Sequence, residues 1–367
     1  MLGGIIGFVI AAVAIVLFGD TSFSEFADKF RAIDVPEILA AVAVAVAAFV
    51  VSVSLLVVIH EAGHMVCGLA SGYRFVSFRI FSFTFVRDAA GRLRVKRFSL
   101  AGTGGQCLLC PPERPLEEIP VVWYNAGGLL ANLLAFLVVL PLMWLDLNPF
   151  VKEFAGIFLI TDAGLLLLNG IPMQSAGMGN DAHNMIALRR NLAAKRGVML
   201  QLKVNSMVQE GARPKDLPAE WFAVSDCVDY RNALEVSVPL MAASRLLDME
   251  RWEEAYGAFS AIYAHREELM PLYAKETACE LACCAMLTGR TVEAEELLAD
   301  KELRKYVEAY RRVMSSKERL LCAEALFIRH DRDAAEAICE ELQRRSPHYL
   351  LQGEVRSDLA LMRAFLK

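Results

Sequence analysis

The sequence lacks the positive charge expected of a nucleic-acid-binding protein. Its 38 Lys and Arg residues are outnumbered by 43 Asp and Glu residues, which gives a formal net charge of −5. No basic stripe with interleaved aromatic residues is apparent, and such a stripe is the usual electrostatic footprint of nucleic-acid binding. We therefore expect no nucleic-acid partner.

The sequence also lacks a recognisable disulfide framework. Nine cysteines are present, but their spacing is scattered. Cys279, Cys283 and Cys284 share one predicted helix, which is typical of reduced, buried thiols in a protein that faces the cytosol. The CxxC at Cys107 and Cys110 has the spacing of metal-binding and redox pairs, but no second CxxC or nearby His completes four zinc ligands. The pair is either incidental or functional, and the sequence favours the first interpretation.

The N-terminal segment lacks the basic start and the A-x-A site of a cleaved signal peptide. Apolar residues instead make up 56% of the chain, which is more than a soluble protein normally contains. Four hydrophobic runs each approach the roughly 20 residues that cross a bilayer core. We therefore predict an integral membrane protein with about four transmembrane helices, at residues 2–18, 38–70, 121–145 and 154–171.

The charges of the connecting loops predict the orientation of these helices. Residues 19–37 contain five acidic and two basic side chains, whereas residues 71–120 contain eight basic and four acidic ones. Basic loops are retained on the cytoplasmic side of a membrane. The second loop, and with it the N- and C-termini, is therefore predicted to be cytoplasmic, and the cell (inner) membrane is the expected location.

The loop between the second and third hydrophobic runs has the pattern of a β-hairpin. Apolar and polar residues alternate over residues 75–86 and again over 93–98, with a turn at 87–92 between them. An exposed strand edge binds extended peptides through main-chain hydrogen bonds. The hairpin therefore either binds a substrate in this way or only packs at the membrane surface.

The sequence after Asp181 becomes charged and helix-forming. A helical stretch within residues 186–230 is followed by a loop rich in Gly and Pro, which is typical of a linker. From about residue 231 onward, helix pairs with small residues at related positions recur about 40 residues apart, which indicates a degenerate tetratricopeptide-like array. The predicted fold is an all-α polytopic membrane domain with a β-hairpin insertion (1–185), a linker with a helix (186–230) and a cytoplasmic, soluble α-helical repeat domain (231–367).

A complete HExxH motif, from His60 to His64, lies at the end of the second hydrophobic run. Residues four apart lie on one helix face, so both imidazoles can bind one zinc ion while Glu61 serves as the general base. A catalytic zinc commonly has a third protein ligand. Asp181 and His183 follow the fourth run at a compatible membrane depth, and carboxylate and imidazole are both good zinc ligands. Chemistry alone leaves both candidates open.

These residues resemble the site-2 protease family of intramembrane zinc metalloproteases. Besides HExxH, members carry a Gly-x-x-x-Asn element and an Asn-x-x-Pro segment that precedes an Asp ligand. The matching residues are Gly128 to Asn132, Asn169 to Pro172, and Asp181. The resemblance covers about residues 50–185, although Asp181 lies twelve residues after Asn169, where the family usually has about eight.

The resemblance implies that His60, His64 and Asp181 bind Zn²⁺ and that Glu61 is catalytic. Asn132, Asn169 and Pro172 would support the site or bind substrate. Asp162, inside the fourth run, is too far along its helix from Asp181 to share a metal with it, so it has another function or an interhelix hydrogen bond.

The implied activity is that of an intramembrane zinc endopeptidase that cleaves a membrane-spanning or membrane-proximal protein. The expected partners are this membrane protein or peptide substrate, the lipid bilayer and a protein bound to the helical-repeat domain. The alternative is a non-enzymatic, membrane-anchored repeat scaffold, or a peptide-binding resistance factor, with a vestigial zinc site. The intact Glu61 favours the enzyme, because a structural zinc site does not need this acid.

Overall fold

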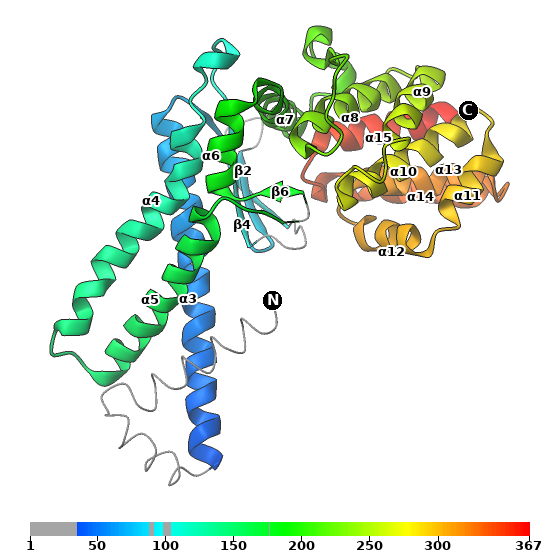
Figure 1. Cartoon of the computed structure of the whole chain (residues 1–367). Helices are drawn as coiled ribbons and strands as arrows, with labels where there is room; N and C mark the ends of the chain where they lie inside the picture. Colours follow the sequence, from blue (N-terminus) through cyan, green and yellow to red (C-terminus); the bar gives the residue numbers. More distant parts are fainter. Residues whose placement is uncertain (1–34, 88–91, 98–103, 176) are drawn as a thin grey trace. The chain divides into compact units, whose positions relative to one another are not determined.

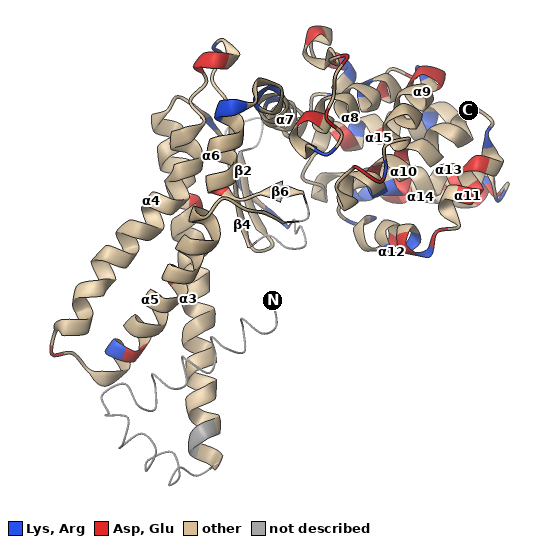
Figure 2. Ribbon diagram, in the orientation of Figure 1, with Lys and Arg blue, Asp and Glu red and all other residues tan. Residues whose placement is uncertain are grey.

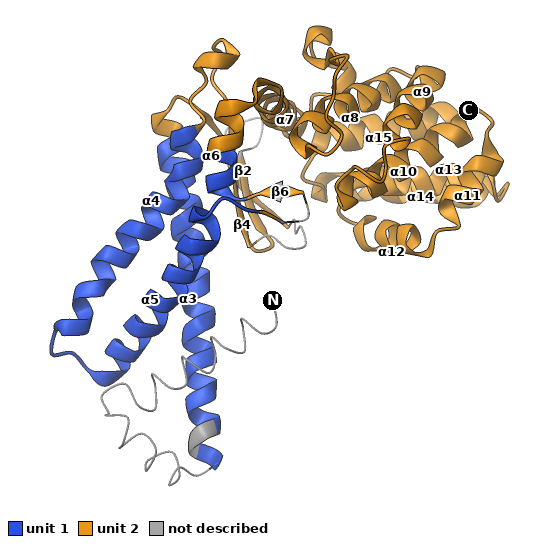
Figure 3. Ribbon diagram, viewed as in Figure 1, with its two compact units in different colours: residues 1–68, 122–173, 180–184 blue, residues 69–121, 174–179, 185–367 orange. Residues whose placement is uncertain are grey.

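The computed structural model describes residues 35–87, 92–97, 104–175 and 177–367. The hydrophobic run at residues 2–18 lies outside them. The described residues are mostly helical, with thirteen α-helices and six strands, and they form two compact units (Figure 3). Of the described residues, unit 1 contains 35–68, Val122–Met173 and Asn180–Asn184, and unit 2 contains the rest.

Unit 1 is built from three long helices, which run up, down and up in Figure 1. They are α3 (Val35–Ala70), α4 (Val122–Val139) and α5 (Pro149–Gly170), and a 3-10 turn at Leu140–Trp144 follows α4. Asn148 begins α5, because its side chain accepts a hydrogen bond from the amide of Phe150, and Pro149 occupies the first helical position. Unit 1 also contains the first turn of α6 (Asp181–Arg190).

Two helical segments in the described part of the chain are long and apolar enough to cross a membrane, Leu39–Ala70 and Leu116–Trp144. Only 17% of each apolar window is buried in the protein, whereas the core helix of a soluble protein is mostly buried. Figure 2 shows that α3 and α4 are almost free of charged residues. The helix α5 covers the last predicted span but is not one of these two segments, so a third crossing there stays a prediction.

Helices α3 and α4 touch at two glycines. A Cβ atom added to Gly127 would lie 2.3 Å from the carbonyl oxygen of Gly63, and one added to Gly63 would lie 2.2 Å from the carbonyl oxygen of Gly127. Small residues allow such close contact between backbones, which is typical of helices packed in a membrane. This contact places the HExxH motif directly against α4.

The predicted β-hairpin is part of a larger, four-stranded antiparallel sheet in unit 2. Its strands have the order β3-β2-β1-β4 and are β1 (Arg74–Ile80), β2 (Phe83–Arg87), β3 (Leu93–Arg97) and β4 (Gly105–Cys110). The prediction of one strand over residues 75–86 is wrong, because a turn at Phe81, with φ of 52°, divides it into β1 and β2.

Strand β4 was not predicted, because its run of Cys and Leu does not alternate with polar residues. It contains the CxxC. Cys107 and Cys110 are both buried, and residues three apart on a strand project from opposite faces of the sheet. This arrangement does not favour a metal shared by the two thiols.

The rest of unit 2 is mainly helical. A two-stranded hairpin of β5 (Gln174–Ser175) and β6 (Met178–Gly179) precedes α6, and α7 (Leu192–Glu210) ends at Gly211, whose φ of 106° suits a left-handed helix cap. The following helices are α8 (Ala233–Asp248), α9 (Trp252–Tyr263), α10 (Pro271–Leu287), α11 (Thr291–Leu298), α12 (Lys301–Tyr310), α13 (Ser315–Phe327), α14 (Arg332–Arg345) and α15 (Gln352–Phe365).

These C-terminal helices pack mainly on their sequence neighbours, with α8 on α9, α10 on α11 and α13 on α14. Buried ion pairs join helices that are further apart in sequence. Lys317 on α13 lies 2.8 Å from Glu276 on α10, and Arg319 lies 2.5 Å from Asp358 on α15. That these helices are repeats of one tetratricopeptide-like unit stays a prediction, as does a domain boundary near residue 185.

The contact between α3 and α4 predicts a strong effect of a single methyl group. We expect Gly127→Ala to destabilise unit 1 by about 1–3 kcal/mol, because the added Cβ overlaps the α3 backbone. Gly164→Ala on α5 is the control, since nothing lies within 4 Å of its Cβ position and Ala is the better helix former by about 1 kcal/mol. Thermal unfolding in detergent measures both. Equal melting temperatures for the two variants would contradict the close contact.

Candidate metal centre

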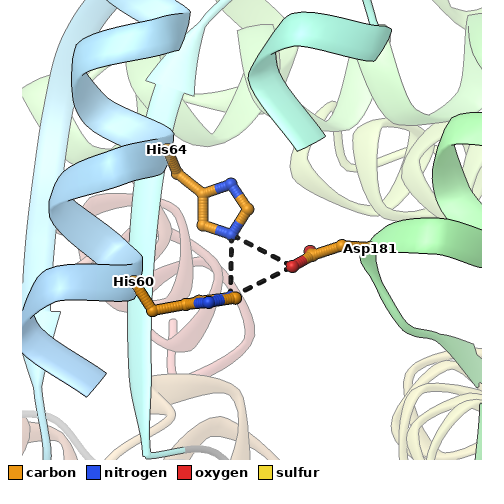
Figure 4. Close-up of side chains that lie close together, drawn as sticks. All are labelled: His60, His64 and Asp181. Carbon is orange, nitrogen blue, oxygen red and sulfur yellow. Dashed lines mark hydrogen bonds and ion pairs between the residues drawn. The ribbon is translucent and has the colours of Figure 1, made fainter. Parts of the chain in front are cut away.

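Three side chains of unit 1 converge on one point (Figure 4). His60 and His64 project from successive turns of α3, and Asp181 is the first residue of α6. The Nε2 atoms of the two histidines are 3.1 Å apart. The Oδ2 atom of Asp181 lies 3.0 Å from Nε2 of His60 and 3.4 Å from Nε2 of His64. In the described part of the chain, this is the group of His, Cys, Asp and Glu side chains that is close enough to hold a metal ion.

The spacing of these three atoms fits a tetrahedral zinc site. Zinc binds imidazole nitrogen at about 2.0–2.1 Å, so neighbouring ligand atoms at the corners of a tetrahedron are about 3.3 Å apart. The three observed distances, from 3.0 to 3.4 Å, bracket this value. Two neutral imidazoles and one carboxylate are also a ligand set of catalytic zinc sites that leave a fourth position open.

His64 is held in the orientation that a metal ligand needs. Its Nδ1 lies 2.8 Å from the backbone carbonyl of Tyr124 on α4, so Nδ1 carries the proton and donates it to this oxygen. The lone pair is then on Nε2, which points at Asp181. A hydrogen bond of this kind sets the tautomer and the ring orientation of a metal-ligating histidine.

The ring of His60 is held by close steric contact with α4. Its imidazole lies against Gly128 of α4 so closely that a Cβ atom at position 128 would be 2.5 Å from Cε1 and 2.7 Å from Nδ1. Only glycine leaves room for the ring. The space that the His60 ring occupies therefore explains why the Gly-x-x-x-Asn element of this protein begins with glycine, at Gly128.

Asp181 is placed by its neighbour Asn180, which uses all four hydrogen-bonding positions of its amide. Its Nδ2 donates to the carbonyls of Leu168 and Ile171 at the end of α5, both at 2.6 Å. Its Oδ1 accepts from the amides of Met173, at 3.1 Å, and His183, at 3.0 Å. Asn180 thus ties the start of α6 to the end of α5 and thereby fixes Asp181 opposite α3.

The carboxyl group of Asp181 is ionised over the whole neutral range. Burial alone would raise its pKa, but the neighbouring imidazoles of His60 and His64 favour the charged carboxylate, outweigh burial and lower the pKa to about 2. Its side chain is 16% exposed, and those of His60 and His64 are 14% and 12% exposed. The group therefore presents an anionic oxygen at a largely buried position, which favours a divalent cation.

Glu61 and His183 lie outside the group of three. Glu61 follows His60 on α3, is partly buried and lies near enough to interact electrostatically with His64. His183 is on the first turn of α6, where its backbone amide is bound by Asn180. Of the two candidates for a third ligand, the structure thus brings Asp181 to the histidines.

The three supporting residues proposed from the sequence do not form one common set of contacts with the ligands. Asn169 donates to the carbonyl of Leu165 within its own helix at 3.2 Å, and Pro172 is exposed just after the end of α5. Asn132 is 1% exposed on α4, one turn after Gly128. Asn169 and Pro172 therefore end α5, and Asn132 lies in the interior of unit 1.

Sequence reasoning missed Asn180 altogether. Asn is a favoured residue immediately before the first turn of a helix, so the pair Asn180-Asp181 carried a helix-start signal. Its bonds to Leu168 and Ile171, however, depend on how the chain returns after Pro172, and no local pattern specifies that path.

Comparison with protein-family models, curated proteins and solved structures returned no match.

The ligand assignment predicts the metal content of single variants. We expect purified wild-type protein to bind one Zn²⁺ per chain, His60→Ala and Asp181→Ala to lose it, and His183→Ala to keep it. Elemental analysis after dialysis measures the stoichiometry. If Asp181→Ala retained zinc and His183→Ala lost it, the third ligand would be His183 and not Asp181.

The position of Asn180 predicts a weaker site when its amide is removed. We expect Asn180→Ala to lower the affinity for Zn²⁺ about 10- to 100-fold, the usual effect of removing a residue that orients a ligand. Asn148→Ala is the matched control, because it removes a helix-start asparagine at the other end of α5. Competition with a chromogenic chelator measures both affinities, and a similar loss in the two variants would refute a specific role of Asn180.

Proposed function

We propose that this protein is an intramembrane zinc endopeptidase. The observation that carries the proposal is the convergence of three side chains: the metal-binding atoms of His60, His64 and Asp181 lie within 3.4 Å of one another. The two histidines and the adjacent Glu61 are on α3, a helix apolar enough to cross a membrane. A purely structural zinc site has no use for a glutamate next to its first ligand, and it usually closes all four positions with protein ligands.

Glu61 is assigned the role of general base. A zinc ion bound by the three ligands would acidify a bound water and polarise the carbonyl of a peptide bond. Glu61 accepts the proton of the attacking water and returns it to the leaving amine, so that the peptide bond is hydrolysed without a covalent intermediate. The hydrogen bond from His64 to the Tyr124 carbonyl and the packing of His60 on Gly128 keep the two imidazoles in place during these steps.

The proposed substrate is a membrane-spanning or membrane-proximal protein. Large apolar side chains of α3 and α4 face outward, among them Val50, Leu55 and Leu134, and such a surface suits lipid or a substrate helix. In unit 2, the edge strand β3 is exposed, with Leu93 and Val95 more than half accessible. An extended segment of substrate can pair with such an edge through main-chain hydrogen bonds.

The C-terminal helices are assigned to recruitment or regulation, since stacked helices offer broad surfaces for protein partners. In the proposed topology both chain ends are cytoplasmic, because the basic residues 71–120 stay inside. The competing function is a non-enzymatic scaffold or peptide-binding factor, in which the three metal ligands have a structural role only.

The general-base assignment predicts separate effects on metal binding and cleavage. We expect Glu61→Gln to keep its Zn²⁺ and to cleave co-expressed single-span membrane proteins at least about 100-fold more slowly than wild type, because the isosteric amide cannot accept a proton. Product bands on immunoblots measure cleavage, and elemental analysis measures zinc.

The control for this experiment is Glu153→Gln on α5, which changes a glutamate of unit 1 that is remote in sequence from the ligands. Equal cleavage by wild type and Glu61→Gln would exclude the peptidase and support the scaffold.

A further inference from the structure

An acidic residue lies in the interior of unit 1 and has no role in the zinc site described above. Asp162, on α5, is 0% exposed, and neither carboxylate oxygen has a hydrogen bond of good geometry to the described residues. A carboxylate in an apolar interior is costly, so such residues are generally kept for a function. The environment of Asp162 indicates what that function is.

Asn132 on α4 is the side chain that approaches Asp162. It is 1% exposed, and its Oδ1 has no hydrogen-bond donor among the described residues. Residues four apart on a helix share a face, so Asn132 lies one turn from Gly128, the residue on which the His60 ring rests. His60 is also close enough to interact electrostatically with Asp162. His60, through its contact with Gly128, and Asp162, through Asn132, therefore both lie next to this segment of α4.

The two histidines differ in the hydrogen bonding of Nδ1, the ring nitrogen that does not face Asp181. His64 donates from Nδ1 to the Tyr124 carbonyl, whereas Nδ1 of His60 has no such hydrogen bond within the described residues. A metal-ligating histidine almost always donates its second N–H to a carboxylate, a carbonyl or a water. A donor at His60 and an acceptor at Asn132, each without a partner, are complementary.

We propose that Asp162, acting through Asn132, positions His60 for metal binding. Nδ1–H of His60 donates to Oδ1 of Asn132, and Nδ2–H of Asn132 donates to the carboxylate of Asp162. The negative charge of Asp162 strengthens both bonds and stabilises the tautomer that leaves the Nε2 lone pair free. Asp162 is a positioning residue, and this role rests on the metal site in the proposed function.

Cobalt affinity tests the relay without any substrate. We expect Asp162→Leu and Asn132→Leu each to weaken Co²⁺ binding about 10- to 100-fold, the usual effect of removing such a partner. The double variant should be no weaker than the worse single variant, because both changes break one chain of hydrogen bonds. Chelator competition gives the affinity, and the visible cobalt spectrum reports the ligand geometry.

Ser52→Ala is the matched control, because Ser52 is also 0% exposed on α3 and its Oγ also has no hydrogen-bond partner in the described residues. We expect it to bind Co²⁺ like wild type. Asp162→Leu should keep or raise the melting temperature, since it replaces a buried acid by an apolar side chain.

The remaining outcomes overturn the relay. Unchanged affinity in Asp162→Leu would refute it while leaving the peptidase intact, as judged by Glu61→Gln. A fall in both affinity and melting temperature, with additive effects in the double variant, would show a merely structural role. A wild type that binds no Co²⁺ would overturn the relay and the zinc site together.

Discussion

The contact of α3 with α4 at Gly63 and Gly127 is the constraint on which the candidate metal centre depends. Because the two backbones touch there, the Tyr124 carbonyl reaches His64 and the glycine at position 128 lies under the ring of His60. A larger residue at any of these glycines would separate the helices or displace a ligand. Helix packing in this unit therefore also orients the two histidines of the candidate metal centre.

The apolar surroundings explain why the few polar side chains of unit 1 both satisfy backbone hydrogen-bonding groups and position the candidate ligands. Each polar atom that is buried away from water needs a partner, because no water is at hand to replace it. Asn180 satisfies four backbone groups at once, and His64 pairs with a backbone carbonyl. The buried oxygens of Asn132 and Asp162 have no hydrogen-bond partner of this kind among the described residues, and the proposed link to His60 would give them one. Positioning of the metal ligands and satisfaction of buried polar groups would then be one and the same requirement.

The sequence predicted the helical character, the two apolar segments of membrane-spanning length and the pair of histidines on one helix face, because each depends on a regular local period. It was less successful where spacing along the chain does not determine the path. The turn at Phe81 divides a strand whose alternation looked continuous, and β4 joins the sheet through a run without alternation. Asn180 was missed for the same reason, since its partners Leu168 and Ile171 are brought to it by the return of the chain after Pro172.

What the sequence by itself determined is that two potential metal ligands lie together on one helix. His60 and His64 share a helix face through their spacing alone, with Glu61 next to them in the chain, whatever else the fold does. Which of Asp181 and His183 lies beside the two histidines was decided only by the tertiary structure. Both residues lie at the start of α6. The hydrogen bonds of the Asn180 side chain place this helix start so that Asp181, and not His183, lies beside the histidines. A metal centre needs atoms within a few ångströms of one point, and for residues more than a hundred positions apart only the packing of helices brings them there.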